Sequence, residues 1–335
     1  MMKNRRFWLC LPLFLLAPLA SQAQERAGPQ DWVWQAKLNQ DDPRVGRVWR
    51  LASADSPDKP GLTDELRAAD FILLGERHDH PDQHRLQAWL VSRLVELGRR
   101  PTLAWEMLPQ DRTPALDRYT GTAAGFGDFV NWTQVWGDNW ALYQPIAEAA
   151  LAADAPQVGA DLTRQQKKAV GQTGFAALGR AEAQRLGLTQ PFLDGAEARL
   201  RDSIAQAHCG LLPETALPAM AKVQRARDAA MADALLAART RDGGPVVLIA
   251  GNGHVAPDYA VGWYLRQRAP ELKVLALSFR EARAANAANV SADDGASAAG
   301  RFLPAFDWYT PQWKDEDPCV AFAASLKKLK NSTAR

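Results

Sequence analysis

Glutamate and histidine side chains crowd into one short segment of this 335-residue chain. Residues 71–84 read Phe-Ile-Leu-Leu-Gly-Glu-Arg-His-Asp-His-Pro-Asp-Gln-His, so an apolar run ends at Gly75 and is followed by Glu76 and His78. Carboxylates and imidazoles transfer protons near neutral pH and bind metal ions. Ligands bind beyond the carboxyl ends of the strands in open α/β sheets, so the end of this predicted strand is the first candidate site.

Two further predicted strands end in residues of the same kinds. Glu106 follows an apolar run, and His254 lies in a glycine-flanked turn directly after the apolar run 246–250. The carboxyl ends of parallel strands lie on one edge of a sheet, so Glu106 and His254 are expected to approach Glu76 and His78. Such a set could hold a divalent metal such as zinc or manganese, with one position open to water. The same side chains could instead hydrogen-bond backbone groups at the rim of the sheet.

The remaining histidines are weaker candidates for ligand binding. His80 and His84 are four residues apart and flank Pro81, which suits the first turn of a helix. We expect these two imidazoles to share a solvated helix face. His208 precedes Cys209 in a helical stretch and is expected to pack or hydrogen-bond rather than to bind a ligand.

Short apolar runs alternate with helical periodicity through most of the chain. Leucines at helical spacing between residues 84 and 99 predict a helix between the first two strands. A strand, a helix and a second strand in this order predict a parallel sheet. We therefore predict an α/β fold with a mostly parallel central sheet flanked by helices. The strands are predicted at 71–75, 102–105, 157–160, 246–250 and 273–277.

Two long intervals between strands are interpreted as helical insertions, at about 108–152 and 163–243. With them, residues 63–330 are predicted to form a single domain after a polar, proline-dotted lead-in at 24–62. Residues 284–300, rich in alanine, asparagine, serine and glycine, are the best candidate for a mobile loop.

Aromatic side chains suggest a second kind of chemistry. Trp132, Trp136, Trp140 and Tyr143 have the spacing of one helical face. That face could pack into the core, or it could form an apolar wall for a flat ligand. Tyrosine phenolate is also a known haem-iron ligand, and two tyrosines, at 259 and 264, follow His254 closely.

The N-terminus has the pattern of a secretory signal peptide. Three basic residues precede the apolar core 7–20, and a small-residue cleavage pattern ends at Ala23. Without residues 1–23, 37 basic and 38 acidic side chains remain, a net charge of −1 that gives no indication of nucleic-acid binding. Cys10 lies inside the apolar core after bulky residues, so lipidation is not expected.

Two cysteines remain after signal removal. In an oxidising compartment, Cys209 and Cys319 could form a disulfide or stay as two buried thiols.

Five segments of the chain, in order, resemble motifs of the ChaN-like haem-binding family of the Tiki superfamily. They are Leu-Leu-Gly-Glu-Arg-His-Asp-His-Pro-Asp-Gln-His at 73–84, Trp-Glu-Met at 105–107, Ala-Gln-Ala-His-Cys-Gly at 205–210, Val-Gln-Arg-Ala-Arg-Asp-Ala-Ala-Met-Ala at 223–232 and Ala-Gly-Asn-Gly-His-Val at 250–255. Together they cover most of the chain from about 65 to 280.

The resemblance implies a bacterial envelope protein linked to haem and iron uptake, with haem bound between the protomers of a dimer and tyrosine as the iron ligand. It does not say which tyrosine takes that role. Tyr259 is the first expectation, followed by Tyr264 and Tyr143, with His254 as a further haem contact. The implied partners are haem, a second copy of the chain and envelope components of haem uptake, in the periplasm.

The same resemblance leaves an enzymatic alternative open. The wider superfamily includes metal-dependent hydrolases that use a Gly-x-x-His motif and a distant histidine, and Gly75, His78, Glu106 and His254 are similar to those positions. The alternative is a metal-dependent peptidase or esterase that uses Glu76 with the last three of these residues. A third hypothesis is an envelope scaffold that binds neither haem nor metal. We favour the non-enzymatic haem-binding protein.

Overall fold

The computed structural model describes residues 32–50, 61–192, 195–256, 258–283, 305–317, 319–320, 322–324 and 326–327. The predicted signal peptide and the predicted mobile loop 284–300 lie outside these residues. The strands are β1 (Val48–Arg50), β2 (Phe71–Glu76), β3 (Thr102–Pro109), β4 (Gln157–Asp161), β5 (Val246–Gly251), β6 (Val274–Ala282) and β7 (Ala305–Pro311). The α-helices are α1 (Leu62–Ala68), α2 (Pro81–Glu96), α3 (Thr113–Leu116), α4 (Ala123–Phe129), α5 (Trp132–Val135), α6 (Trp140–Ala152), α7 (Arg164–Thr173), α8 (Arg180–Arg185), α9 (Ala196–Ala207), α10 (Leu217–Asp242) and α11 (Val261–Arg268).

The strands form a seven-stranded sheet in the order β1-β7-β6-β2-β5-β3-β4. The pairs from β7 to β4 are parallel, and only the short edge strand β1 is antiparallel to its neighbour. The predicted α/β fold with a mostly parallel sheet is therefore confirmed. All five predicted strands are present, and each continues past its predicted C-terminal end, although β6 begins at Val274 rather than at 273.

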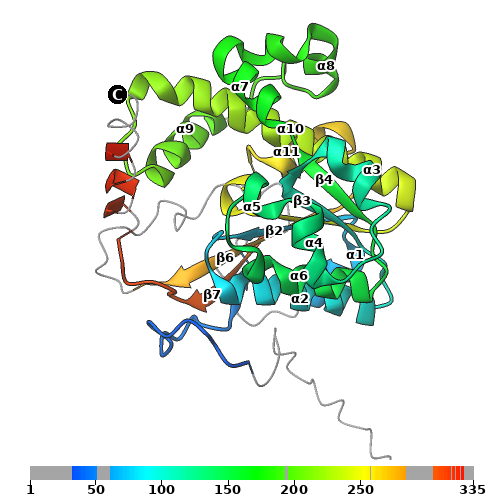
Figure 1. Cartoon of the computed structure of the whole chain (residues 1–335). Coiled ribbons are helices and arrows are strands. Elements are labelled where there is room, and N and C mark those ends of the chain that lie inside the picture. Colours follow the sequence, from blue (N-terminus) through cyan, green and yellow to red (C-terminus); the bar gives the residue numbers. More distant parts are fainter. Residues whose placement is uncertain are drawn as a thin grey trace, which may run out of the picture.

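Helices cover both faces of the sheet, as Figure 1 shows with α2 and α6 on one side and α10 and α11 on the other. Successive side chains of a strand point to opposite faces. Ile72 and Leu74 of β2 accordingly join the core under α2 and α6, whereas Phe71 and Leu73 join the core under α10 and α11. This double burial explains the near-continuous apolar runs of the central strands.

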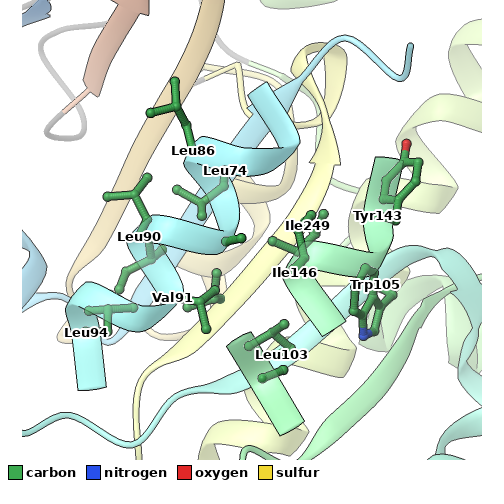
Figure 2. Packing of buried hydrophobic residues seen from close by; sticks show 14 of the residues in the cluster. Leu74, Leu86, Leu90, Val91, Leu94, Leu103, Trp105, Tyr143, Ile146 and Ile249 are labelled. Carbon is green, nitrogen blue, oxygen red and sulfur yellow. The ribbon is translucent and has the colours of Figure 1, made fainter. Parts of the chain in front are cut away.

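The core between the sheet and the helices α2 and α6 lies directly beneath the candidate site. Figure 2 shows Leu86 and Leu90 of α2 beside Leu74 of β2, with Ile146 of α6 near Ile249 of β5. All five side chains are at most 1% exposed. This packing holds the carboxyl ends of β2 and β5 in fixed register.

Two strands of the sheet were not among those predicted. β1 lies in the predicted lead-in and pairs with β7. In β7, the acidic Asp307 interrupts the apolar pattern, yet it is buried because Arg280 of β6 donates to its carboxylate at 3.2 Å. A buried ion pair of this kind is invisible to a hydrophobic-periodicity argument.

A disulfide joins Cys209, just after α9, to Cys319 in the C-terminal segment. Of the two states considered for this pair, the bridged one is confirmed. The bridge ties the α9 end of the second helical interval to a segment 110 residues later in the chain. Within the described residues, no helix has the length and apolarity needed to cross a membrane.

Candidate functional site

The carboxyl ends of β2, β5 and β3 are adjacent in the sheet and bring the predicted polar residues together. Glu76 ends β2 and lies opposite Gly251, which ends β5. Glu106 of β3 accepts a hydrogen bond from the backbone N–H of Gly251 at 2.7 Å. His254 follows in the short 3₁₀ turn after β5. The predicted convergence at one sheet edge is therefore present.

Glu76 is a buried carboxylate that anchors two neighbouring side chains. Its Oε1 lies 2.6 Å from Nδ1 of His78 and accepts a hydrogen bond from the Tyr143 hydroxyl at 3.0 Å. The Glu76 side chain is 0% exposed, whereas that of His78 is 44% exposed. The pair thus connects the interior to the surface, with the imidazole on the outside.

The environment of His78 combines charge with flat apolar surface. Burial disfavours a charged imidazole, but the Glu76 carboxylate outweighs it and raises the pKa of His78 to about 9. The ring of Trp136 meets the imidazole edge-on, with centroids 4.9 Å apart. A Cβ atom at Gly251 would lie 2.8 Å from Cε1 of His78, so only glycine leaves room for the imidazole there.

A second network of hydrogen bonds and ion pairs surrounds Glu106. His254 has Nδ1 2.6 Å from Asp228 and Nε2 3.2 Å from Glu106. Arg227 donates to Glu106 at 2.6 Å and to Asp161 at 3.1 Å. Both nitrogens of His254 are therefore engaged with carboxylates of the protein.

The pKa values in this network follow from its buried charges. Burial opposes ionisation of Glu106, but His254 and Arg227 hold the pKa of that carboxyl well below its usual range. Burial likewise opposes charge on His254, yet the carboxylates of Glu106 and Asp228 raise the pKa of the imidazole to about 9. Burial raises the pKa of Asp228 to about 6. At neutral pH, His254 is therefore an imidazolium between two carboxylates.

Raising the pH from 7 to 9.5 is expected to remove about 2 kcal/mol of unfolding free energy through His254. The pKa of about 9 in the folded protein exceeds the ordinary 6.5, so the stabilisation is complete below pH 6.5 and is lost as the pH rises through 9. Urea unfolding of the wild type and of His254→Gln at both pH values measures it. The variant should lose less stability than the wild type, and an equal loss in both would contradict the assignment.

The prediction that His80 and His84 are solvated was wrong, because both imidazoles are 0% exposed. The N-terminal end of α2 packs against the sheet edge, so this face of the helix is buried. Nε2 of His80 donates to the Pro311 carbonyl at 2.9 Å, and Nδ1 of His84 donates to the His80 carbonyl at 2.7 Å. Burial lowers the pKa of both histidines, which are therefore neutral at pH 7.

Two buried acceptor atoms face each other beneath this edge. Oε2 of Glu76 and Nε2 of His84 are 3.8 Å apart, and neither has a hydrogen-bonding partner among the described residues. Because Nδ1 of His84 holds that ring's proton, its Nε2 presents a lone pair.

The predicted aromatic face is divided between two short helices. α5 ends at Val135, and Gly137, with φ +133°, separates it from α6. Trp132 and Tyr143 are buried and pack against each other with ring centroids 4.8 Å apart. The core-packing interpretation therefore describes Trp132 and Tyr143, while Trp136 lies at the rim beside His78.

The predicted haem-ligating tyrosines lie apart from one another. Tyr143 is 0% exposed, and burial together with Glu76 raises the pKa of its phenol. Tyr264 is also 0% exposed, and its hydroxyl accepts a hydrogen bond from Arg225 at 3.2 Å. Tyr259 is 6% exposed and packs in a separate small cluster with residues of α9. The role of each as an iron ligand stays a prediction.

The metal-ion alternative also stays a prediction. Glu76 and His78 form one pair and Glu106 and His254 another, and each pair is engaged as described above. Within the described ranges, no group of three or more His, Cys, Asp or Glu side chains could hold a metal ion.

Sequence reasoning missed the charged residues that α10 contributes. Arg227 and Asp228 lie in a segment that is otherwise rich in alanine, and several of these alanines are buried. Two adjacent charged residues in an alanine-rich stretch could have indicated buried ion pairs, since charged side chains are rarely buried unless they are paired.

Comparison with known proteins agrees with this architecture. The family model described as "Haem-binding uptake, Tiki superfamily, ChaN" matches residues 62–265, more than half of the chain. A search of curated protein sequences found no significant match.

Among solved structures, the fold is similar to that of ChaN of Campylobacter jejuni, described for its cofacial heme binding. The sequence identity is 19% and the TM-score 0.59, over 78% of this chain and 95% of that one. A protein from Bacillus cereus is also similar, at 15% identity and a TM-score of 0.40 over 70% of this chain and 73% of that one. The parallel sheet, the motif positions at its edge and the family match together place this chain in the ChaN haem-binding uptake family of the Tiki superfamily.

Proposed function

We propose that this protein is a periplasmic haem-binding protein that acts in haem or iron uptake or storage. The observation that carries the proposal is family membership across residues 62–265. The similarity in fold to Campylobacter jejuni ChaN, for which cofacial heme binding is described, supports it.

The proposal that the protein is exported to the periplasm rests on its N-terminal sequence and on one disulfide bond. The first 23 residues have the basic, apolar and small-residue regions of a signal peptide. The Cys209–Cys319 disulfide is of the kind that persists in oxidising compartments.

The described residues include side chains of the kinds that bind an iron porphyrin. Imidazole and phenol are both known axial ligands, and haem sites are usually lined by apolar and aromatic side chains. His78 offers a half-exposed imidazole beside Trp136, and Phe129 of the same helical interval is 42% exposed. Bound haem would supply an iron that accepts an axial ligand, and the protein would supply that ligand and an apolar surface.

The partners form the second part of the proposal. Cofacial haem binding suits two copies of a chain that bring their haems together, so a homodimer and envelope haem-uptake components are proposed as partners. Native mass spectrometry of the haem-loaded protein is expected to show a dimer, and a monomer with bound haem would exclude this part alone.

Haem loading in cells tests the proposed function. Bacteria expressing the full chain are separated into periplasmic and cytoplasmic fractions, and haem in the purified protein is measured as its pyridine complex. We expect haem-containing protein in the periplasmic fraction. A variant without residues 1–23 is the matched control and should stay in the cytoplasm. Periplasmic protein that contains no haem in haem-replete cells would contradict the proposal.

A further inference from the structure

Two buried acceptor atoms lie beneath the half-exposed imidazole of His78. Oε2 of Glu76 and Nε2 of His84 are 3.8 Å apart, and both side chains are 0% exposed. Neither atom has a hydrogen-bonding partner among the described residues. A buried acceptor without a donor has lost its hydration and gained nothing in return, so native proteins rarely leave one unpaired. Two such atoms that face each other point to a small ligand that donates to both.

Neither side chain can turn to find a donor elsewhere. The other oxygen of Glu76, Oε1, already lies 2.6 Å from Nδ1 of His78 and accepts from the Tyr143 hydroxyl at 3.0 Å. The other nitrogen of His84, Nδ1, donates to the His80 carbonyl at 2.7 Å. Rotating the carboxylate or the imidazole would break these bonds, so Oε2 and Nε2 are held where they are.

The positions of the protons exclude a direct bond between the two groups. A carbonyl oxygen only accepts, so the proton of the His84 ring lies on Nδ1. Burial lowers the pKa of His84, so the ring is neutral at pH 7 and its Nε2 carries a lone pair. The Glu76 carboxylate, paired with His78, is likewise an acceptor only. The separation of 3.8 Å also exceeds that of a hydrogen bond.

The ligand must supply two donors in a small space, and a water molecule does so. A water oxygen about 2.8 Å from both atoms would see them at an angle of about 85°, near the roughly 105° between its O–H bonds. A divalent cation would need more ligands than these two. Within the parts of the chain that the structure describes, no group of three or more His, Cys, Asp or Glu side chains could hold one.

We propose that Glu76 and His84 together bind one internal water molecule, which donates one hydrogen bond to Oε2 and one to Nε2. Buried waters typically bind polar groups that have no other partner. This water continues the hydrogen-bonded chain from the imidazole of His78, through Glu76, to His84 in the interior. Both oxygens of the buried carboxylate are then hydrogen-bonded while it holds His78 at the surface. The inference goes beyond haem binding and does not depend on it.

A crystal structure of the purified protein, grown without haemin, tests the site directly. We expect electron density for one water about 2.8 Å from both Oε2 of Glu76 and Nε2 of His84. Direct contact between the two atoms, or no density between them, would overturn the proposal. An ion with shorter distances and additional ligands would also overturn it, because the site would then bind a cation.

Nitrogen-15 NMR of the histidine side chains tests the same site in solution. At pH 7, the His84 ring should show a protonated Nδ1 and an unprotonated Nε2. A proton on Nε2 would overturn the proposal, because His84 would then donate to Glu76 without a water. His208 is the reference for this tautomer, since its Nδ1 also donates to a carbonyl four residues earlier, that of Ile204, at 2.7 Å.

Oxygen-17 magnetic relaxation dispersion, which counts long-lived internal waters, tests the contribution of His84. His84→Phe keeps a flat ring but removes the acceptor, so it should contain one long-lived water fewer than the wild type. His208→Phe is the matched control, because it loses the same kind of bond to the backbone, and its count should equal that of the wild type. Equal counts in all three proteins would overturn the role of His84. If His84→Phe does not fold, the crystal structure and the NMR spectrum of the wild type decide the proposal by themselves.

None of these measurements uses haemin, so their outcomes are separate from the proposed function. A wild type that contains the water but binds no haemin would contradict the proposed function alone. A haemin-binding protein without the water would contradict this inference alone.

Discussion

Replacing Arg227 with methionine is expected to lower the unfolding free energy by about 3 kcal/mol, because the change removes the one guanidinium that two buried carboxylates share. Arg227 donates to Glu106 and to Asp161, whose side chains are 1% and 2% exposed. Breaking a buried ion pair from one side exposes the remaining charge to the full desolvation penalty. Lys167, at 2.6 Å from Asp161, and the His254 imidazolium, at 3.2 Å from Glu106, remain in the variant and offset only part of the loss.

Denaturant unfolding at pH 7 measures this effect, and α10 offers its own control. Arg241 lies on the same helix but is 38% exposed, and it pairs with Asp117, also 38% exposed, and with the adjacent Asp242, 17% exposed. An exposed ion pair contributes about 1 kcal/mol or less, so Arg241→Met should change stability by no more than that. Similar losses for the two variants would contradict the buried network.

Substituting alanine for Gly159 is expected to destabilise the protein by about 3 kcal/mol, at the upper end of the range for overpacking. A Cβ at this position would lie 2.1 Å from the carbonyl oxygen of Pro109. The clash is with backbone and cannot be relieved by rotating a side chain. Relief requires β3 and β4 to separate, and these strands carry Glu106 and Asp161 into the site.

The matched control for this prediction is Gly171→Ala in α7. Its Cβ would meet the nearest atom, Cγ2 of Val223, at 3.5 Å, an ordinary contact. Alanine is favoured over glycine inside a helix by about 0.5–1 kcal/mol, so this variant should be as stable as the wild type or more so. Thermal unfolding compares the two variants. A Gly159→Ala protein as stable as Gly171→Ala would show that β3 and β4 are less tightly packed than described.

The central sheet was predictable because its strands are buried on both faces. The runs that contain Phe71 and Val246 are apolar at nearly every position, and each ends at glycine. Such runs depend only on local sequence and on the double burial of parallel strands. The edge strands were harder, since β1 has three residues and β7 carries the buried Asp307.

For the site, the sequence predicted which residues come together at the sheet edge, but not the hydrogen-bonding partners that hold them. Topology brings Glu76, Glu106 and His254 to one edge, and that much follows from parallel pairing. The partners could not be derived in the same way, because Arg227 lies 121 positions from Glu106 and reaches it from a helix above the sheet. The burial of His84 likewise depends on how α2 packs, which spacing alone does not determine.

Titration of the purified protein with haemin at neutral pH, followed by its Soret absorption, tests the central claim most directly. The account predicts a shifted band that grows to saturation. Iron-free protoporphyrin, which cannot accept an axial ligand, should bind more weakly. A spectrum that remains that of free haemin, and that rises linearly without saturation, would contradict haem binding by this chain.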